Sequence, residues 1–237
     1  MSGYGAFARY YDELTANVDY RGRALYYAGL IREHSLRRRG ILLDLACGTG
    51  SLSYKLADLG FDVIGVDASG EMLSLAAARG GEKRPLFLCQ SMEELDLYGT
   101  VDACVCALDS LNHLKNFKAL KLAFKRVSLF LAPGGVFAFD LNTEFKHRHI
   151  LANNVFVRET DKVFCVWRNE LRKHGGVDIS LDFFERRPDG RYLRSAEQFT
   201  ERLFSHREIL SALRAAGLDC LKVYGYGTKA PPKKNTR

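Results

Sequence analysis

A glycine-rich segment with one acidic residue inside it and another after it predicts a ligand-binding loop. The segment reads Leu42-Leu43-Asp44-Leu45-Ala46-Cys47-Gly48-Thr49-Gly50, and Asp67 lies further along the chain. Glycines at positions 48 and 50 let the backbone turn sharply and approach a ligand closely. The N–H groups at the start of a following helix suit an anionic group. An acid at the position of Asp67 can accept hydrogen bonds from both hydroxyls of a ribose. The pattern therefore predicts a site for a nucleoside that carries an acidic group.

Two kinds of nucleoside ligand could use such a loop. A dinucleotide requires G-x-G-x-x-G, whereas Ser53 stands here at the position of the third glycine. Asp44 would also repel a pyrophosphate, because like charges repel. S-adenosylmethionine carries a carboxylate, no phosphate, and an amine that Asp44 can hold. The loop therefore favours S-adenosylmethionine, and a nucleotide-dependent oxidoreductase is the alternative class.

Alternating strands and helices are expected to position this loop. Short apolar runs predict strands over residues 41–45, 63–66, 86–89, 101–108 and 136–140. Between them, helical spacing of apolar residues predicts helices over about 25–31, 52–59, 72–79 and 116–130. Such alternation predicts a doubly wound α/β fold with a mostly parallel sheet.

The pattern changes in the second half of the chain. Strands are expected over 162–171, 177–186 and 192–203, with a turn at Pro188-Asp189-Gly190, as in an antiparallel β meander. Ser205 and Glu208 form a capping-box pattern that starts a helix reaching about residue 216, before a last strand over about 220–224. We therefore expect an α/β core with an N-terminal helical cap over 1–149, an inserted lid over 150–204, and a return to the core sheet over 205–237.

In this order, the motifs resemble those of class I S-adenosylmethionine-dependent methyltransferases, which have a Rossmann-like fold. Within that class the chain is similar to small bacterial methyltransferases related to the sugar amine N-methyltransferases. The shared segments are Phe7-Ala8-Arg9-Tyr10-Tyr11-Asp12, Val18-Asp19-Tyr20, the glycine loop, Asp67-Ala68-Ser69 with Met72, Leu108-Asp109-Ser110-Leu111-Asn112-His113-Leu114, Leu131-x-Pro133-Gly134-Gly135 and Ser205-His206-Arg207-Glu208-Ile209. The resemblance covers nearly the whole chain.

The resemblance implies a set of cofactor-binding residues. The glycine loop would lie against the methionine moiety, Asp67 would bind the ribose, Met72 and Met92 would pack on the adenine, and two tyrosines would close the pocket. The full set is Tyr11, Tyr20, Asp44, Ala46, Cys47, Gly48, Gly50, Asp67, Ala68, Met72, Ser91, Met92, Glu93 and Leu108. Relatives usually offer an acid to the adenine amine where this chain has Ser91, and a neutral acceptor bonds more weakly. Met72 could also be a core residue, as could Tyr4 and Phe7.

Methyl transfer is an in-line displacement, so alignment and exclusion of water are the main tasks of the enzyme. His113 follows the fourth expected strand and is the candidate acid/base catalyst, or else a histidine that caps a helix or supports a neighbour. Asp109 and Asn112 could orient an acceptor or cap the following helix. The inserted meander is the expected lid over the acceptor. The resemblance implies a small-molecule acceptor, and RNA or protein is the alternative. The arginines at positions 186, 187, 191 and 194 suit an acidic acceptor or bulk water.

Bulk properties narrow the class of protein further. The formal net charge is +7, with basic clusters at Arg37–Arg39, at Lys115, Lys118, Lys121, Lys125 and Arg126, and at the C-terminus. Helical spacing within the second cluster is typical of a solvated face, so nucleic acid is not the favoured partner. No apolar run approaches the roughly 20 residues that cross a bilayer, and no secretory signal is present, so we expect a cytoplasmic monomer or homodimer.

The cysteines and the C-terminal segment carry two more expectations. The six cysteines lack zinc-ligand spacing, so we expect reduced thiols and no metal. Class I sheets usually end in a hairpin whose final strand lies between the fifth and sixth. Only residues 225–237 follow the expected sixth strand, so we expect that final strand to be missing or replaced by a partner chain.

Overall fold

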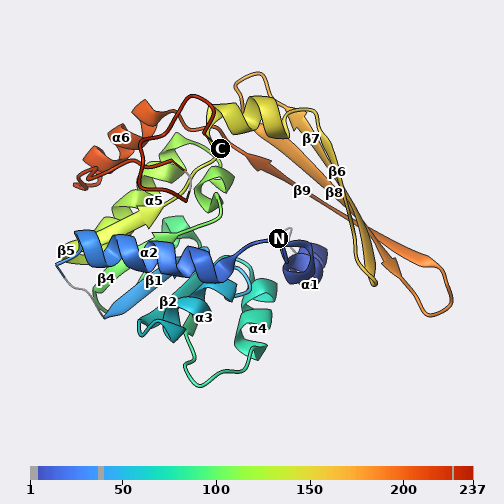
Figure 1. The fold of residues 1–237 in the computed structure, drawn as a ribbon, viewed down its shortest axis with the longest axis horizontal. Helices are drawn as coiled ribbons and strands as arrows, with labels where there is room; N and C mark the ends of the chain where they lie inside the picture. The colour runs from blue at the N-terminus through green and yellow to red at the C-terminus, as the bar shows by residue number, and fades with distance from the viewer. Residues whose placement is uncertain (1–4, 37–39, 226, 237) are drawn as a thin grey trace.

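Two β-sheets, one parallel and one antiparallel, organise the protein (Figure 1). The computed structural model describes residues 5–36, 40–225 and 227–236. Tyr4 and the cluster Arg37–Arg39 lie outside the described residues. Among the described residues, no helix has the length and apolar character that would let it cross a membrane.

The parallel sheet has the order β3-β2-β1-β4-β5, which confirms the doubly wound prediction. Its strands are β1 (Ile41–Leu45), β2 (Asp62–Asp67), β3 (Leu86–Cys89), β4 (Val101–Cys106) and β5 (Leu131–Phe139). The helices α3 (Ser51–Asp58), α4 (Gly70–Ala78) and α5 (Phe117–Phe130) connect consecutive strands. The strand order reverses between β1 and β4, and ligands bind at the carboxyl ends of the strands beside such a switch point.

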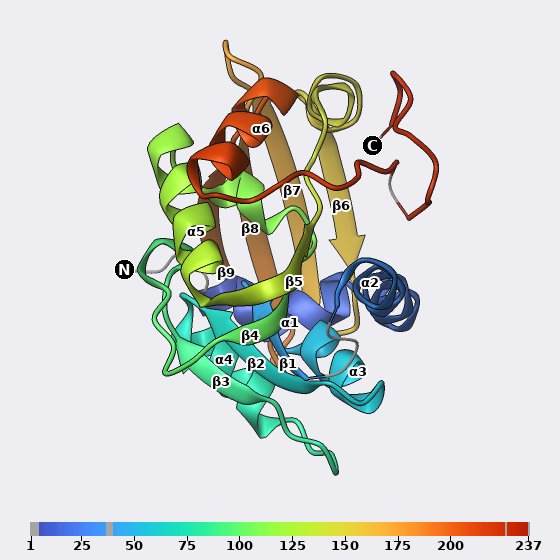
Figure 2. The ribbon, with the colours of Figure 1, turned by 90° about the vertical axis from the view of Figure 1, so that its left-hand side faces the viewer.

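Helices cover both faces of this sheet (Figure 2). Helices α5 and α6 (His206–Ala215) pack on one face, where Phe124, Val127 and Leu213 join one buried apolar cluster. Helices α2 (Tyr20–His34) and α3 pack on the other face, where Ile31 and Leu56 join a second cluster. Burial on both faces explains why the central strands β1 and β4 read as continuous apolar runs, whereas the edge strand β3 stays partly exposed.

Two strand boundaries differ from the expected ones. Strand β4 ends at Cys106, and Leu108 and Asp109 beyond it have φ angles of 60° and 53°. Strand β5 begins at Leu131, so Pro133-Gly134-Gly135 lies within the strand and not in a turn before it. Gly134 has a φ of 77°, and the register between β4 and β5 shifts in this region. A local irregularity of this kind keeps the strands paired around residues that would otherwise end them.

An antiparallel sheet of four strands, here called the lid sheet, follows the core (Figure 1). It contains β6 (Val155–Glu159), β7 (Val163–Leu171), β8 (Val177–Arg186) and β9 (Tyr192–Glu201) in sequence order. The sequence predicts the last three strands but not β6, a short edge strand of mixed pattern. A π-helix, η3 (Lys146–Leu151), leads into the sheet. The inner face packs on α1 (Gly5–Leu14), where Phe7 and Tyr10 contact Phe183.

The C-terminal segment departs from the prediction. Helix α6 starts at the capping box of Ser205 and Glu208, as predicted. The strand expected over 220–224 is wrong, because residues 218–225 have no regular secondary structure and pair with no described strand. This segment and β5 both line a cavity of about 1620 Å³. Leu221 and Val223 are exposed.

Candidate active site

The glycine loop lies at the carboxyl end of β1, and its two glycines have different roles. Gly48 has a φ of 56°, and a Cβ atom there would meet no described atom within 4 Å, so the loop faces open space at this point. Gly50 has a φ of 74°, and a Cβ there would lie 2.9 Å from the Phe87 Cζ atom and 3.1 Å from the Ala76 Cβ atom. Gly48 therefore allows a ligand to approach, whereas Gly50 allows the loop to pack on its own core.

Asp67 ends β2 and fastens the loop. Its Oδ2 atom accepts the N–H of Gly48 and its Oδ1 atom accepts the N–H of Ser69, each at 2.8 Å. Burial raises the pKa of Asp67, although these two N–H groups oppose the shift. Each carboxylate oxygen has a further lone pair that can accept a hydroxyl. The residue can thus bind a ribose while it holds the loop.

Asp44 lies beneath the loop and is almost fully buried. Burial and the charge of Asp67 raise the pKa of Asp44 to about 7, against the hydrogen bond that Ser53 donates at 2.5 Å. The negative charge of the ionised Asp44 is therefore poorly stabilised at neutral pH. A ligand amine would supply the missing positive charge.

A small cavity beside the loop collects half of the expected cofactor residues. The N-terminal segment contributes two of its walls, Tyr11 from α1 and Tyr20 from the start of α2. The expected residues that line it are Tyr11, Tyr20, Asp44, Ala46, Cys47, Gly48 and Leu108. Thr49, Ser51, Leu52, Ala107 and Ser110 complete the lining.

The other expected residues lie outside this cavity. Met72 is buried in the cluster that joins α1 to the lid sheet, as its core interpretation predicts. Met92 and Glu93 belong to the short helix η1 (Met92–Glu94) after β3, where Met92 packs against the core and the Ser91 hydroxyl donates to Glu94 at 2.9 Å. The carbonyl of Ala68, the residue after Asp67, accepts a weak hydrogen bond from the Cys89 thiol at 3.8 Å. Their assignment to the adenine stays a prediction.

His113 lies between the glycine loop and the lid sheet. It ends the short helix η2 (Ser110–His113), and its ring centroid is 5.2 Å from that of Phe199 on β9. Electrostatic interaction with His113 acts to lower the pKa values of Asp67, Asp109 and Glu201, whereas burial acts to raise them. His113 therefore reaches both parts of the site electrostatically.

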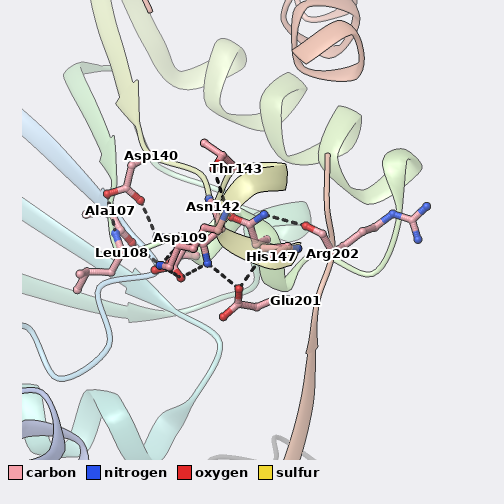
Figure 3. A network of polar contacts seen from close by, with 12 residues as sticks. Ala107, Leu108, Asp109, Asp140, Asn142, Thr143, His147, Glu201 and Arg202 are labelled. Atoms are coloured by element: carbon pink, nitrogen blue, oxygen red, sulfur yellow. Dashed lines mark hydrogen bonds and ion pairs between the residues drawn. The ribbon is translucent and has the colours of Figure 1, made fainter. Parts of the chain in front are cut away.

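Asn142 is the centre of a polar network that the sequence analysis missed (Figure 3). Its Nδ2 atom donates to the Asp109 Oδ2 atom at 2.5 Å and to the Glu201 Oε2 atom at 2.6 Å. Its Oδ1 atom accepts the Lys146 ammonium at 2.6 Å, which fixes the orientation of the amide. Here the polar network means Asp109, Asn142, Lys146, His147 and Glu201. It joins the carboxyl ends of β4 and β5 to the last residue of β9.

His147 supports this network from the interior. Its Nδ1 atom donates to the Gly175 carbonyl at 2.8 Å, and its Nε2 atom lies 3.5 Å from the Glu201 Oε2 atom. Burial acts to raise the pKa of Glu201, but the neighbouring His147 and His113 and the hydrogen bond from Asn142 outweigh it and hold the pKa below its ordinary value. Glu201 is therefore kept ionised.

Asp140, directly after β5, holds the irregular backbone at the end of β4 (Figure 3). Its carboxylate accepts the N–H of Leu108 at 3.2 Å and that of Asp109 at 2.6 Å, and also the Tyr27 hydroxyl at 3.0 Å. Of the two alternatives for Asp109 and Asn112, capping of α5 does not hold, because Asn116 is the N-cap of that helix. Asn112 binds the backbone of Asn142 and Arg202 instead. Polar residues directly after strands were the available sequence signal for this network.

Fold and site together define a nucleoside-binding α/β enzyme with a covering lid sheet. Residues 42–135 match the family profile described as a methyltransferase domain. The YqeM protein of Bacillus subtilis (strain 168), whose name describes it as a methyltransferase, is 33% identical over 235 residues, covering 97% of this chain and 92% of that protein.

Solved structures agree with these sequence relatives. An S-adenosylmethionine-dependent methyltransferase from Clostridium acetobutylicum ATCC 824 has a TM-score of 0.86 and 33% identity, covering 98% of this chain and 95% of its own. CalS10 with bound S-adenosylmethionine, an amino pentose methyltransferase from Micromonospora echinaspora, has a TM-score of 0.71 and 26% identity, covering 90% and 89% of the two chains. The chain belongs to the S-adenosylmethionine-dependent methyltransferases.

S-adenosylmethionine is accordingly the cofactor, and the oxidoreductase alternative is set aside. The open space at Gly48 leaves room for the cofactor to lie against the backbone of the loop. The Asp67 carboxylate suits its ribose, and the buried Asp44 carboxylate suits its amine. When bound, it supplies an electrophilic methyl group on a sulfonium. The residues of the chain must hold it, exclude water and present an acceptor.

Proposed function

We propose that this enzyme methylates a nitrogen atom of a small molecule. The observation that carries this proposal is the pair of carboxylates, Asp109 and Glu201, joined by the Asn142 amide between the glycine loop and the lid sheet. Two acids in a partly desolvated site attract cationic groups, because opposite charges attract strongly at low dielectric, and Lys146 already places one ammonium 3.7 Å from Asp109. An amine or ammonium is the acceptor chemistry that fits.

The way the lid sheet joins the core supports a small acceptor. Arg202, directly after β9, donates its N–H to the Asn112 carbonyl at 2.6 Å and accepts the Asn112 side-chain amide at 2.7 Å. Glu201, Asn142 and His147 beside this junction are almost fully buried. An acceptor must therefore enter beneath an ordered sheet, which limits its size.

Relatives support the same acceptor class. CalS10 is named as an amino pentose methyltransferase, and it covers nine-tenths of this chain. Named relatives over about half of this chain include glycine N-methyltransferases, which also act on a small amine by their name. Both kinds of acceptor present nitrogen.

The residues of the chain divide the work of such a reaction. Asp44, the glycine loop and Asp67 hold the methyl donor, while Tyr11 and Tyr20 cover it. The polar network binds the acceptor nitrogen. The lid sheet excludes water, which would compete for the methyl group.

Labelled S-adenosylmethionine and a bacterial cell extract provide the test. After incubation with the protein, the extract is separated into low-mass, protein and nucleic-acid fractions. We expect the label in low-mass compounds retained by a cation exchanger. Label confined to RNA or protein would replace this proposal by one of the two alternatives, and a steep salt dependence would support RNA.

A further inference from the structure

The backbone at Leu108 and Asp109 is held in an unfavourable conformation. Both residues have left-handed φ angles, of 60° and 53°, and neither is a glycine. Such conformations are costly for residues with a Cβ atom and cluster at functional sites. The bidentate acceptance of their two N–H groups by Asp140 keeps this turn in place. The strained turn directs one side chain, that of Asp109, into the polar network.

Exposure separates Asp109 from its partners. The side chain of Asp109 is 25% exposed, whereas those of Glu201 and His147 are 5% and 0% exposed. Leu108 and Ser110, on either side of Asp109, line the cavity beside the glycine loop. Asp109 is thus the more exposed carboxylate of the pair and lies between two residues that line this cavity.

We propose that Asp109 is a catalytic residue that binds the acceptor nitrogen and takes its proton, while Asp140 and Asn142 are its positioning residues. This proposal rests on the proposed function. It assigns to Asp109 the acid/base role that the sequence analysis considered for His113.

The proton and electron balance of the step is simple. An ammonium acceptor has no lone pair, so one proton first passes from nitrogen to the Asp109 carboxylate. The neutral nitrogen then forms a bond to the methyl carbon as the C–S bond breaks, and the sulfur keeps the bonding electrons. The product leaves as a methylated ammonium, and Asp109 returns its proton to solvent.

The surroundings of Asp109 suit proton transfer. Burial and the charge of Glu201 raise the pKa of Asp109, and the nearby Lys146, at 3.7 Å, opposes them. Asp140 and His113 also act on this carboxylate. The charge of Asp109 also acts to raise the pKa of Tyr11, which lines the cavity beside the glycine loop. A raised pKa of the carboxyl group lies closer to the pKa of an ammonium, and this match favours proton transfer between the two groups.

A comparison of Asp109→Asn with the unmodified protein tests the proposal. One measurement is the affinity for S-adenosylhomocysteine by calorimetry, and the other is the rate of label transfer into whole bacterial extract from pH 5.5 to 9. Asp109→Asn should keep the affinity within about threefold, since the donor contacts come from other residues, but lower transfer by about 100-fold, the scale of lost acid/base catalysis. The unmodified enzyme should gain rate with rising pH as Asp109 ionises, whereas the variant should gain rate only at the higher pH where the acceptor loses its proton to solvent.

Two further variants sharpen the comparison. Asp140→Asn should leave the pH limb but lower transfer by about tenfold, because an amide cannot accept both N–H groups. Asp189→Asn, in the exposed β8–β9 turn, is the matched control and should change neither measurement. Unaltered transfer in Asp109→Asn overturns the proposal, and so does a large loss of S-adenosylhomocysteine affinity, which would place Asp109 in the donor site.

The outcome also distinguishes the two proposals. If the unmodified protein labels only RNA or protein, the small-molecule function fails, and the ratio of the variant to the unmodified rate still decides the role of Asp109. If low-mass compounds are labelled equally by both, only the role of Asp109 fails. Absence of label in every fraction would count against both.

Discussion

Asp67 combines two tasks in a single side chain, which makes it the most informative residue of the donor site. It fixes the glycine loop through Gly48 and retains lone pairs for a ribose. We expect Asp67→Ala to weaken S-adenosylhomocysteine binding at least about tenfold, or about 1.4 kcal/mol. Asp62→Ala, an exposed position at the start of the same strand, is the matched control and should not alter the affinity measured by calorimetry. Equal affinities in the two variants would remove Asp67 from the donor site.

Asp44 should make stability depend on pH. Its pKa is about 7 in the folded chain and ordinarily 3.8, so the folded state binds the proton more tightly. Between these values the unfolded state carries fewer protons, and the free energy of unfolding therefore falls as the pH rises from about 4 to 7. We expect Asp44→Asn to lose part of this fall, because its amide does not ionise. Urea titrations at pH 5.5 and 8 measure the difference, and parallel pH dependences in both proteins would contradict the assignment.

At the scale of elements, helix α1 acts as a cover held from two sides. The Asp12 carboxylate accepts the Thr49 hydroxyl at 2.7 Å and also pairs with Arg79, which fastens α1 to the glycine loop. On the other side, the N–H of Phe7 donates to the Glu197 carboxylate of the lid sheet at 2.8 Å. Tyr11, on the same helix, lines the donor cavity. Helix α1 thus connects the glycine loop and the cavity beside it to the lid sheet.

Release of α1 from the loop should shorten the residence of the donor product. We expect Asp12→Ala to raise the dissociation rate of S-adenosylhomocysteine by about fivefold, on the scale of about 1 kcal/mol for a lost charge-assisted contact. Stopped-flow fluorescence measures this rate. Asp58→Ala, at the end of α3, removes a comparable exposed ion pair and is the control. A similar change in both variants would show that the contacts of Asp12 with Thr49 and Arg79 have no specific effect on the dissociation rate.

Elements with strong local signals were predictable from the sequence, and those that depend on partners were not. Strand β3 and the capping box of α6 match their predictions because short apolar runs and caps are local features. Strand β6 has two exposed valines and little alternation, so its pairing comes only from β7. The segment 218–225 has strand-like composition but no ladder partner among the described residues.

The same distinction applies to the candidate site. The glycine loop and Asp67 form a contiguous motif whose spacing carries the information. The polar network brings together Asp109, Asn142 and Glu201 from three distant parts of the chain, and no sequence period relates them. Only the topology shows that the ends of β4, β5 and β9 meet.

At the scale of the whole molecule, the buried contact between His147 and Glu201 joins η3, the segment between the two sheets, to the lid sheet. His147 belongs to η3 and also binds the carbonyl of Gly175 before β8. One imidazole therefore connects η3, the lid sheet and the polar network. Removal of one partner from a buried pair leaves the other without compensation, whereas replacement of both can be nearly neutral. The lid sheet should therefore be more sensitive to the single changes than to the double change.

We expect His147→Leu to lower the free energy of unfolding by about 3 kcal/mol, because the Glu201 charge then lacks its buried partner. The double variant His147→Leu with Glu201→Gln should recover at least about half of that loss, since the glutamine is neutral and its carbonyl can still accept from Asn142. Urea unfolding followed by circular dichroism and by the fluorescence of Trp167 in β7 reports on the whole chain and on the lid sheet separately. In the single variant the tryptophan signal should change at lower urea than the dichroism, because the lid sheet loses its anchor first. Coincident transitions, together with a loss of unfolding free energy in the double variant that equals the sum of the single losses, would contradict this role. They would show that the imidazole contributes only apolar packing.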